Sequence, residues 1–459
     1  MPPRTPLPLA AALLLPLALA GCGSSSASDG NHVTVTVGYQ SKTINTVTAG
    51  TLLRSLGYFE RELKALGKRD GRTYEVKWQD YATGAPITAQ MTAGKVDIGS
   101  MGDFPLLINA YRGAQLDAPT ELVSVTGYNM RGGLNTVVVP PGSDIDSLAD
   151  LKGRKVSTSE GSAADGTLVR ALERAGLDPA EDISKLNQQP AVGASALEGG
   201  SVDALSQFVA WPGLLAFQDR ARALYDGGRL DLPTFHGVVV RESFADDEPA
   251  VLRAFLRAQT DAGRYLEDKP LDASLKVADA TGLPPEVVHL YNGPDGTATF
   301  DPTLKPALVE AFRDDVKLMQ DAELIGDVDV DDFVDDAHIR KAYGAGYDRQ
   351  LAHAAGVVRT SEVWLDGEER TRSFPDAAGA LAFAAEHEGA VRAVFVPDAA
   401  TGTRWFADRA AWVRDGTDLH PFVTAESARD WAADHAGAEV VDHRTASAAA
   451  AKQAGEGGR

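Results

Sequence analysis

The sequence has one cysteine, Cys22, among its 459 residues. A lone cysteine excludes an internal disulfide framework and any metal centre built from several thiolates. Methionine is scarce as well, and none follows Met319. The C-terminal part of the chain therefore offers no sulfur ligand to a soft metal ion such as Cu(I).

Basic residues are also in short supply. The chain has 44 Lys and Arg against 65 Asp and Glu, which gives a formal net charge of −21. An excess of negative charge repels the phosphates of nucleic acids and the head groups of anionic lipids. We therefore expect no nucleic-acid partner.

Long hydrophobic runs are absent beyond the N-terminus. Residues 1–21 read "MPPRTPLPLAAALLLPLALAG", one basic residue followed by an apolar stretch that ends on small side chains. This is the pattern of a secretory signal peptide, and it is shorter than the roughly 20 apolar residues that span a bilayer. The alternative is a buried N-terminal helix, but Pro2, Pro3 and the polar run from Ser24 disfavour it.

The four residues Leu19-Ala20-Gly21-Cys22 resemble a bacterial lipobox, in which the cysteine is acylated and becomes the first mature residue. The resemblance implies an exported protein, anchored to the outer face of the cell membrane by a lipid on Cys22. Residues 22–32 are polar and small, and we expect them to form a flexible tether.

Residues 33–355 lack the usual catalytic motifs. They contain no phosphate-binding Walker loop, no G-x-S-x-G, no H-E-x-x-H and no histidines paired at ligand spacing. We therefore expect neither an enzyme nor a bound cofactor or metal.

What these residues do contain is a repeated order of strand, loop and helix. Val33, Val35 and Val37 alternate with polar residues, and six apolar residues between Leu52 and Leu66 then recur at helical spacing. This order predicts an α/β fold with a parallel sheet covered on both faces. The segment "MTAGKVDIGS" at 91–100 is echoed by "LEGGSVDALS" at 197–206, as expected of two similar lobes that face each other.

Ligands of open α/β sheets bind beyond the carboxyl ends of the strands, so the loops after the strands supply the candidate site. Most of their polar groups are neutral hydrogen-bonding groups, and Ser162 is expected to cap a helix with free N–H groups that suit an anion. The alternative for Asp103 is a helix cap, and for Trp211 a place in the core before Pro212. The candidate ligand-binding residues are Gln40, Thr43, Tyr81, Thr83, Gly102, Asp103, Arg131, Ser162, Gln207 and Trp211.

The order of "VTVGYQ", "TAGKVDIGSMGDFPLL", "LKGRKVSTSEGSAADGTLVRAL" and "LEGGSVDALSQFVAWP" resembles the periplasmic substrate-binding proteins of ABC importers, in the nitrate/sulfonate/taurine branch. The resemblance implies a two-lobed type II binding-protein fold over residues 33–355, with the second lobe at about 136–233. It also implies a small solute held between the lobes and delivered to a membrane permease with its ATPase.

Arg131 is the arginine nearest to the predicted cleft, and a doubly charged oxyanion would favour such a residue. A solvated loop charge is an equally good interpretation of Arg131. We therefore expect a small polar or anionic organic solute of the sulfonate type.

The last hundred residues contain a repeat with an offset of 48. Trp364 aligns with Trp412, Phe374 with Phe422, and His387 with His435. Such regular spacing indicates duplication, and each copy reads as a β-β-α-β unit. We expect a small α+β domain at 356–445 and a disordered tail at 446–459. Deletion of residues 356–459 is expected to leave solute binding intact.

This repeat domain resembles the NosL family of copper-binding lipoproteins linked to nitrous oxide reductase. A metal-handling accessory lipoprotein is therefore the alternative function. Sulfur is missing, however, and the residues left for a metal are His387, His420, His435 and His443. His387 and His435 precede helix-ending glycines, where a histidine also interacts favourably with the helix dipole.

Overall fold

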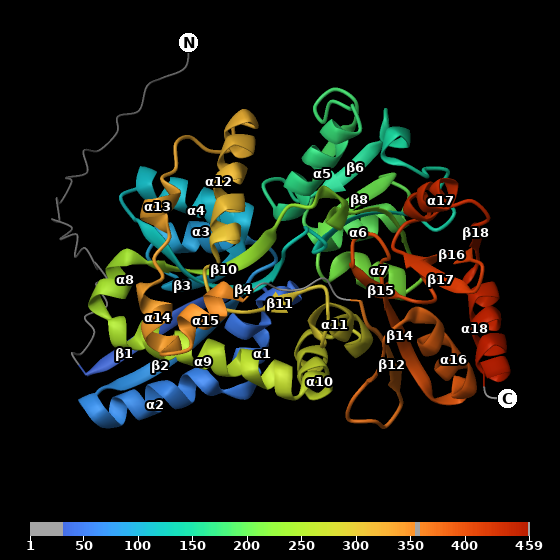
Figure 1. The fold of residues 1–459 in the computed structure, drawn as a ribbon. Coiled ribbons are helices and arrows are strands. Elements are labelled where there is room, and N and C mark those ends of the chain that lie inside the picture. Colours follow the sequence, from blue (N-terminus) through green and yellow to red (C-terminus); the bar gives the residue numbers. More distant parts are fainter. Residues whose placement is uncertain (1–30, 354–358, 458–459) are drawn as a thin grey trace, which may run out of the picture.

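The computed structural model describes residues 31–353 and 359–457 (Figure 1). The chain forms two α/β lobes and a C-terminal domain, and the fold is the two-lobed one expected from the sequence. The predicted signal peptide, Cys22 and most of the predicted tether lie outside the described residues. In the described part of the chain, no helix combines the length and the apolar character needed to cross a membrane.

Lobe 1 is built on a six-stranded sheet in the order β11-β4-β10-β3-β1-β2. Its strands are β1 (His32–Tyr39), β2 (Thr73–Asp80), β3 (Ile98–Gly102), β4 (Thr120–Asn129), β10 (Thr234–Arg241) and β11 (Thr299–Phe300). The sheet is mixed rather than purely parallel, because β10 pairs antiparallel with both β3 and β4. The chain leaves lobe 1 at the carboxyl end of β4 and returns from lobe 2 at that same edge, so β10 must run in the opposite direction.

Helices cover both faces of this sheet. They are α1 (Thr51–Leu56), α2 (Tyr58–Asp70), α3 (Gly84–Thr92), α4 (Asp103–Gln115), α8 (Glu242–Asp247), α9 (Pro249–Asp268), α10 (Pro270–Thr281), α11 (Pro285–Asn292), α12 (Pro306–Asp321), α13 (Val330–Phe333), α14 (Ala337–Tyr343) and α15 (Tyr347–Ala352). The helical spacing from Leu52 to Leu66 is divided between α1 and α2 by Gly57, whose φ of 62° ends α1.

Lobe 2 has a five-stranded sheet in the order β7-β6-β8-β5-β9. Its strands are β5 (Asn135–Val139), β6 (Lys155–Thr158), β7 (Ser184–Asn187), β8 (Ala204–Phe208) and β9 (Arg222–Asp226), with helices α5 (Ala163–Arg174), α6 (Pro190–Glu198) and α7 (Trp211–Phe217). The two echoed segments occupy equivalent places. Asp97 before β3 accepts a hydrogen bond from the Thr36 N–H, and Asp203 before β8 accepts one from the Lys155 N–H.

The C-terminal domain consists of two β-β-α-β units followed by a long helix. The first unit contains β12 (Ser361–Leu365), β13 (Arg372–Phe374), α16 (Ala377–Glu386) and β14 (Val391–Pro397), with β15 (Arg404–Phe406) at the sheet edge. The second contains β16 (Ala411–Asp415), β17 (Asp418–Phe422), α17 (Ala425–Asp434) and β18 (Glu439–Val441). Adding the predicted offset of 48 to the residue numbers of α16 gives the bounds of α17.

The predicted disordered tail at 446–459 is wrong over its described part. Helix α18 (His443–Gly457) extends through it. The run is rich in alanine, which has the highest helix propensity, and Ala446 and Ala450 lie on one face that packs against Trp412 and α16.

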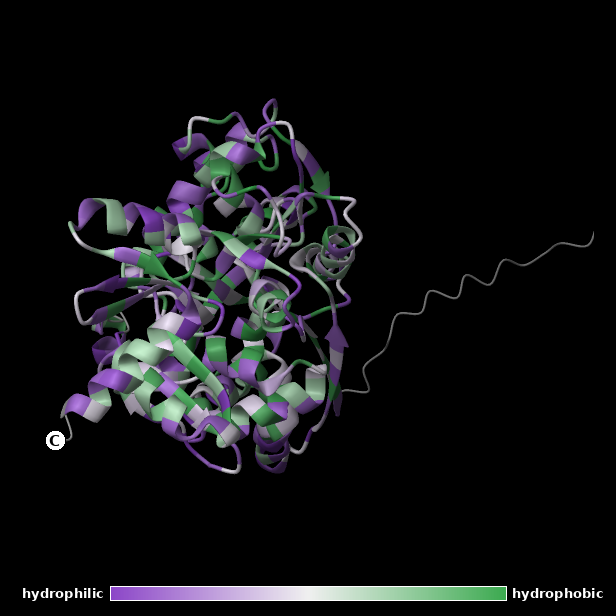
Figure 2. Ribbon diagram, turned by 90° about the vertical axis from the view of Figure 1, so that its right-hand side faces the viewer, coloured by the Kyte–Doolittle hydropathy of each residue, from purple (hydrophilic) through white to green (hydrophobic). Residues whose placement is uncertain are grey.

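The C-terminal domain shares a hydrophobic core with both lobes. Trp405 and Phe406 pack in one cluster with Tyr291 of lobe 1 and Ala216 of lobe 2. In Figure 1 the domain lies beside lobe 2 and next to α10 and α11. Figure 2 shows that the helices carry hydrophobic and hydrophilic residues in alternating bands. Removal of the domain would therefore expose this shared apolar surface to water, and its separability from solute binding stays a prediction.

Candidate functional site

A cavity of about 140 Å³ lies between lobe 1 and lobe 2. It is placed where the carboxyl ends of β1 and β3 face the loop after β6, as expected for an α/β fold. The lining residues are Gln40, Thr83, Gly84, Ala85, Thr88, Gly102, Pro105, Ile108, Ser159, Glu160, Gly161, Ser162, Ala163, Asn187, Gln189, Phe208 and His236.

Two helices begin at this cavity. Thr83 precedes α3 and its side chain makes no capping hydrogen bond, whereas the Ser162 hydroxyl before α5 accepts the Asp165 N–H at 3.3 Å. The unpaired N–H groups and the dipole at a helix N-terminus favour an anion. Both lobes thus direct partial positive charge toward the same small space.

His236 on β10 contributes a hydrogen-bond donor. The Asn45 amide nitrogen lies 2.7 Å from Nδ1 of His236 and 3.3 Å from the Gly127 carbonyl oxygen, so it donates to both. Nδ1 is then the acceptor, and Nε2 carries the hydrogen beside Gly102 at the cavity. Burial lowers the pKa of His236 to about 3, so the ring is neutral at physiological pH.

The remaining lining combines an apolar wall with one charge. Pro105, Ile108 and Phe208 supply apolar surface, and Glu160 is the one acidic residue among the lining residues. Glu160 is exposed, accepts a hydrogen bond from the Asn187 amide and lies 3.9 Å from Lys185. The cavity therefore offers neutral donors and no cationic side chain.

The lobes touch each other around the cavity. Arg170 on α5 of lobe 2 forms a 2.7 Å ion pair with Asp315 on α12 of lobe 1, and both side chains are largely buried. A Cβ on Gly166 of lobe 2 would lie within 2.1 Å of the Phe104 ring of lobe 1. Such close contacts across the cleft indicate that the lobes are closed.

Four of the predicted ligand-binding residues line the cavity: Gln40, Thr83, Gly102 and Ser162. Two others support it from behind. Gln207 is fully buried and donates to Ser159, which lines the cavity, and Thr43 contacts the Gln40 side chain. Tyr81 donates to Gln79 and does not line the cavity.

Asp103 is a structural residue. It is buried, and its carboxylate accepts hydrogen bonds from the Phe104 N–H, the Thr234 hydroxyl and the Phe235 N–H. These contacts join the first turn of α4 to β10, and Asp103 is the first residue of the helix, after Gly102 at the cap position.

Arg131 and Trp211 also lie outside the cavity. Arg131 forms an ion pair with Asp231 at 2.8 Å and donates to the carbonyl oxygens of Ala400 and Thr401 in the C-terminal domain. Trp211 is half-buried and packs against the apolar cluster of lobe 2 that contains Leu215. The core interpretation therefore describes Trp211 better than the cleft interpretation.

Sequence reasoning missed His236, Phe208 and Ser159. His236 lies on the strand that returns from lobe 2, far along the chain from the loops of β1 and β3, and only the antiparallel insertion of β10 brings it beside Gly102. Ser159 follows β6 directly, so the strand-end rule that selected Ser162 could have found it.

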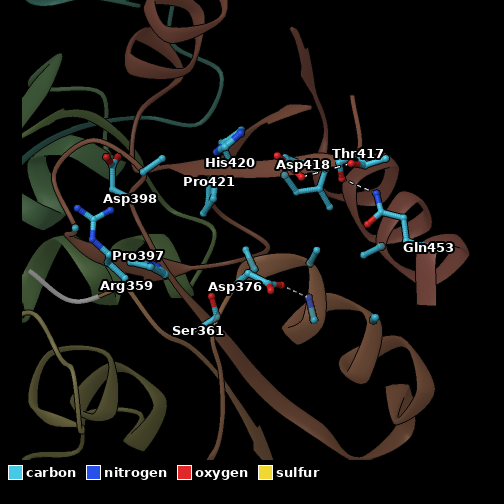
Figure 3. Close-up of a pocket in the computed structure, with 18 of the residues that line it drawn as sticks. Arg359, Ser361, Asp376, Pro397, Asp398, Thr417, Asp418, His420, Pro421 and Gln453 are labelled. Carbon is cyan, nitrogen blue, oxygen red and sulfur yellow. Dashed lines mark hydrogen bonds between the residues drawn. The ribbon is translucent and has the colours of Figure 1, made fainter. Parts of the chain in front are cut away.

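A second cavity, of about 650 Å³, lies in the C-terminal domain, and Arg131 of the connection between β4 and β5 also lines it (Figure 3). Its polar side chains are largely engaged by the fold itself. Asp376 caps α16 by accepting the Gly379 N–H, Asp398 accepts N–H groups of its own loop and of Val423, and Gln453 of α18 donates to the Thr417 carbonyl oxygen. These groups hold the two repeat units and α18 together.

The histidines of this domain pack against aromatic rings, and His420 contacts Trp431 while His443 contacts Trp412. His387 stacks on Phe383 and its Nδ1 lies 2.8 Å from the Phe383 carbonyl oxygen, and His435 repeats both contacts with Trp431. The helix-end interpretation of these two residues accounts for their positions.

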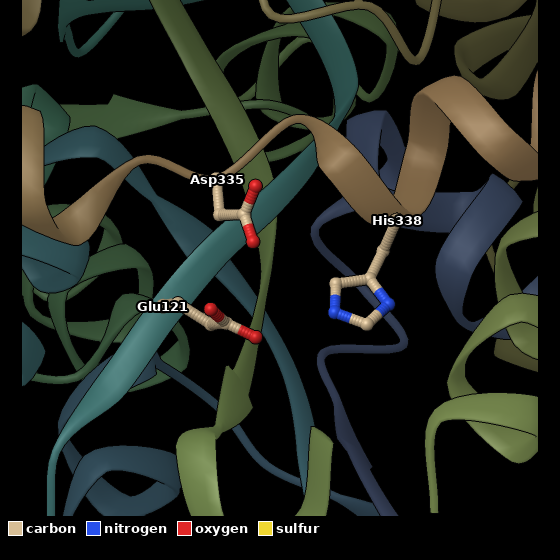
Figure 4. Close-up of side chains that lie close together, drawn as sticks. All are labelled: Glu121, Asp335 and His338. Atoms are coloured by element: carbon tan, nitrogen blue, oxygen red, sulfur yellow. The ribbon is translucent and has the colours of Figure 1, made fainter. Parts of the chain in front are cut away.

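Glu121, Asp335 and His338 lie together at the edge of lobe 1 (Figure 4), with ligand-type atoms within 4.8 Å of one another. This is the one such grouping among residues 31–353 and 359–457. Burial, assisted by Asp335 and by Glu242 and Asp246, raises the pKa of Glu121 to about 7. The folded protein therefore holds a proton on Glu121 that the unfolded chain releases near pH 4.5.

This shift predicts a pH-dependent effect of Glu121→Gln. A raised carboxyl pKa means that stability falls as the pH rises from about 4.5 to 7, because ionisation is easier in the unfolded chain. The neutral glutamine escapes this loss, so the variant should be more stable than the wild type by about 1–2 kcal/mol at pH 8, and the advantage should shrink toward pH 4.5. Urea unfolding at several pH values measures it, with the exposed Glu386→Gln as the control. An advantage that does not depend on pH would contradict the argument.

Comparisons with known proteins agree with this geometry. A family profile described as "NMT1/THI5 like" matches residues 75–273. The taurine-binding periplasmic protein of Escherichia coli (strain K12) is 25% identical over 295 residues, which cover 64% of this chain and 85% of that protein.

Two solved structures are similar in fold. The alkanesulfonate-binding protein SsuA from Xanthomonas axonopodis pv. citri, bound to MOPS, has a TM-score of 0.55 and 24% identity over 66% of this chain and 97% of its own. The periplasmic aliphatic sulphonate binding protein SsuA from Escherichia coli has a TM-score of 0.53 and 23% identity over 68% and 99%. The body of this chain has the fold of the periplasmic binding proteins, and the matches together support a receptor of the substrate-binding type.

Proposed function

We propose that this protein is an extracytoplasmic solute receptor of an ABC importer, and that it captures a small organic monoanion of the sulfonate class between its lobes. The observation that carries the proposal is the closed cavity, whose lining has neutral donors from both lobes, two helix N-termini, the one acidic side chain of Glu160 at its exposed rim and no cationic side chain. Such a site stabilises one negative charge through N–H groups and helix dipoles. A doubly charged anion would lack a basic partner.

The apolar wall selects for an organic substituent. Phe208 from lobe 2 and Pro105 and Ile108 from lobe 1 all line the cavity, so an alkyl group would exchange water for apolar contacts there. Nitrate has no such group. The cavity of about 140 Å³ also favours a short-chain sulfonate over a bulky buffer sulfonate.

Isothermal titration calorimetry of the purified protein tests the proposal. The panel contains ethanesulfonate, taurine, MOPS, nitrate, benzoate and copper(II) chloride. We expect a short sulfonate to bind most tightly and nitrate to bind weakly or not at all. Tight copper binding without any sulfonate binding would instead favour the metal-handling alternative, for which the contacts of His387 and His435 offer no support.

We also propose that Cys22 carries a lipid and that the loaded receptor docks on the transmembrane subunits of a permease with its ATPase. The support for the anchor is the pattern Leu19-Ala20-Gly21-Cys22 after an apolar run. Mass spectrometry of the mature protein should find acylation at Cys22, and Cys22→Ser should release the protein from membranes. A mature N-terminus upstream of residue 22 would contradict the anchor.

A further inference from the structure

Two connections join the lobes, residues 130–134 between β4 and β5 and residues 227–233 between β9 and β10. Any rotation of lobe 2 away from lobe 1 has to change the backbone of these connections. Arg131 of the first connection and Asp231 of the second form an ion pair, so the connections lie side by side.

The loop Asp398–Thr403 of the C-terminal domain, which we call the hinge-contact loop, lies on both connections. Thr401 and Thr403 donate to the buried carboxylate of Asp226 at 2.6 and 3.1 Å, at the start of the second connection. A Cβ on Gly133 or on Gly228 would lie 2.7 Å from the Thr403 hydroxyl, so the loop is in direct contact with both backbones.

The C-terminal domain is bound to lobe 1 through α11 and the residues after it. Glu362 of the domain accepts a hydrogen bond from His289 of α11 at 3.1 Å, and Arg404, which pairs with Glu362 inside the domain, donates to the carbonyl oxygen of Pro294 just after α11. Arg392 of the domain forms an ion pair with Glu286 of α11. These buried contacts fix the domain firmly on lobe 1.

The same domain is bound to lobe 2 through the buried hydrogen bonds to Asp226 of β9 and through ion pairs that are more exposed. Arg229 of lobe 2 pairs with Glu426 of α17, and Asp219 of lobe 2 pairs with Arg409 at 3.1 Å. Phe217 at the end of α7 packs on Phe406, with ring centroids 5.4 Å apart. A rotation that opens the cleft while the domain stays on lobe 1 has to break this second set.

We propose that the C-terminal domain is an intramolecular brace, which holds the two lobes in their closed orientation even without ligand. One rigid body attached to lobe 1, to lobe 2 and to both connections stabilises the orientation in which all its contacts are made. A larger closed fraction raises the apparent affinity for a ligand that binds the closed form, because less free energy is spent on closing.

The test reverses the charge of the C-terminal-domain residue in each ion pair to lobe 2 and measures the shape of the ligand-free protein. The variant Glu426→Lys/Arg409→Glu leaves the net charge unchanged and makes both contacts repulsive. In small-angle X-ray scattering, the ligand-free wild type should match the closed structure and the variant should have a larger radius of gyration. Adding Arg229→Glu and Asp219→Lys in lobe 2 restores both attractions and should restore the compact form.

The matched control is Asp434→Lys/Arg444→Glu, the same charge changes at exposed positions of the same domain, and it should scatter like the wild type. Circular dichroism establishes folding, and the single change Glu426→Lys serves if the double variant does not fold. A folded variant with wild-type scattering, or an open ligand-free wild type, would overturn the brace. Scattering needs no ligand, so its outcome is separate from that of the sulfonate panel. For the tightest sulfonate of the panel, the opened variant should bind at least about threefold more weakly.

Discussion

His236→Phe is expected to weaken binding of the tightest sulfonate of the panel by at least about tenfold. Phenylalanine keeps the ring but removes the Nε2 hydrogen that faces the cavity beside Gly102. A hydrogen bond to a charged acceptor contributes about 1.5–3 kcal/mol, and its loss destabilises the complex with the anion. Titration calorimetry measures the affinity, and thermal unfolding without ligand measures the cost to the fold.

The matched variant is His236→Gln, whose amide can donate from a similar position, and it should recover part of the affinity. The pH dependence of the wild-type affinity is a second test of the role of His236. Because burial lowers the pKa of His236 to about 3, its neutral ring donates equally well from pH 5 to 8, and affinity should be flat over this range. A histidine with its ordinary pKa would bind an anion more tightly as the pH falls through 6.5. Such a rise, or equal affinity in wild type and His236→Phe, would exclude the proposed role.

Arg404→Met is expected to lower the free energy of unfolding by about 3–5 kcal/mol. Arg404 and Glu362 are each about 1% exposed, and their charged atoms lie 2.7 Å apart. Burial opposes the ionisation of Glu362, but Arg404 and His289 outweigh it and lower its pKa to about 2. The variant leaves this carboxylate buried without its cation, and urea unfolding measures the cost.

Two controls separate charge from packing. Arg414→Met breaks an exposed ion pair with Glu439 and should cost under about 1 kcal/mol. Arg404→Met/Glu362→Leu removes both charges and should recover most of the lost stability, because an apolar pair needs no hydration. The depressed pKa of Glu362 also means that its contribution is present above about pH 4.5 and is lost as the pH falls toward 2. Equal stability of Arg404→Met and wild type at pH 7 would refute the analysis.

Local patterns predicted what depends on local chemistry. Alternation in residues 33–37, the glycine-ended helices before Val96-Asp97 and Val202-Asp203, and the 48-residue repeat each follow from periodicity and capping, and the structure has elements at each place. Ser162 was found for the same reason, because a serine before a helix is a local signal.

The tertiary structure decided what depends on contacts between distant segments. His236 reaches the cavity because β10 enters the lobe 1 sheet between β3 and β4, and a sheet order of this kind leaves no trace in the spacing of β10 itself. The surroundings of Arg131 and of the repeat domain depended on such contacts. The sequence left open whether Arg131 faces the cleft or the solvent, and it gave no sign of what the repeat domain packs against, but the fold brings Arg131 against Ala400 and Glu362 of the repeat domain against His289 of lobe 1. The sequence by itself thus determined the elements and the residue types of the loops, whereas the packing of three bodies decided which of those residues face the cavity and which hold the lobes together.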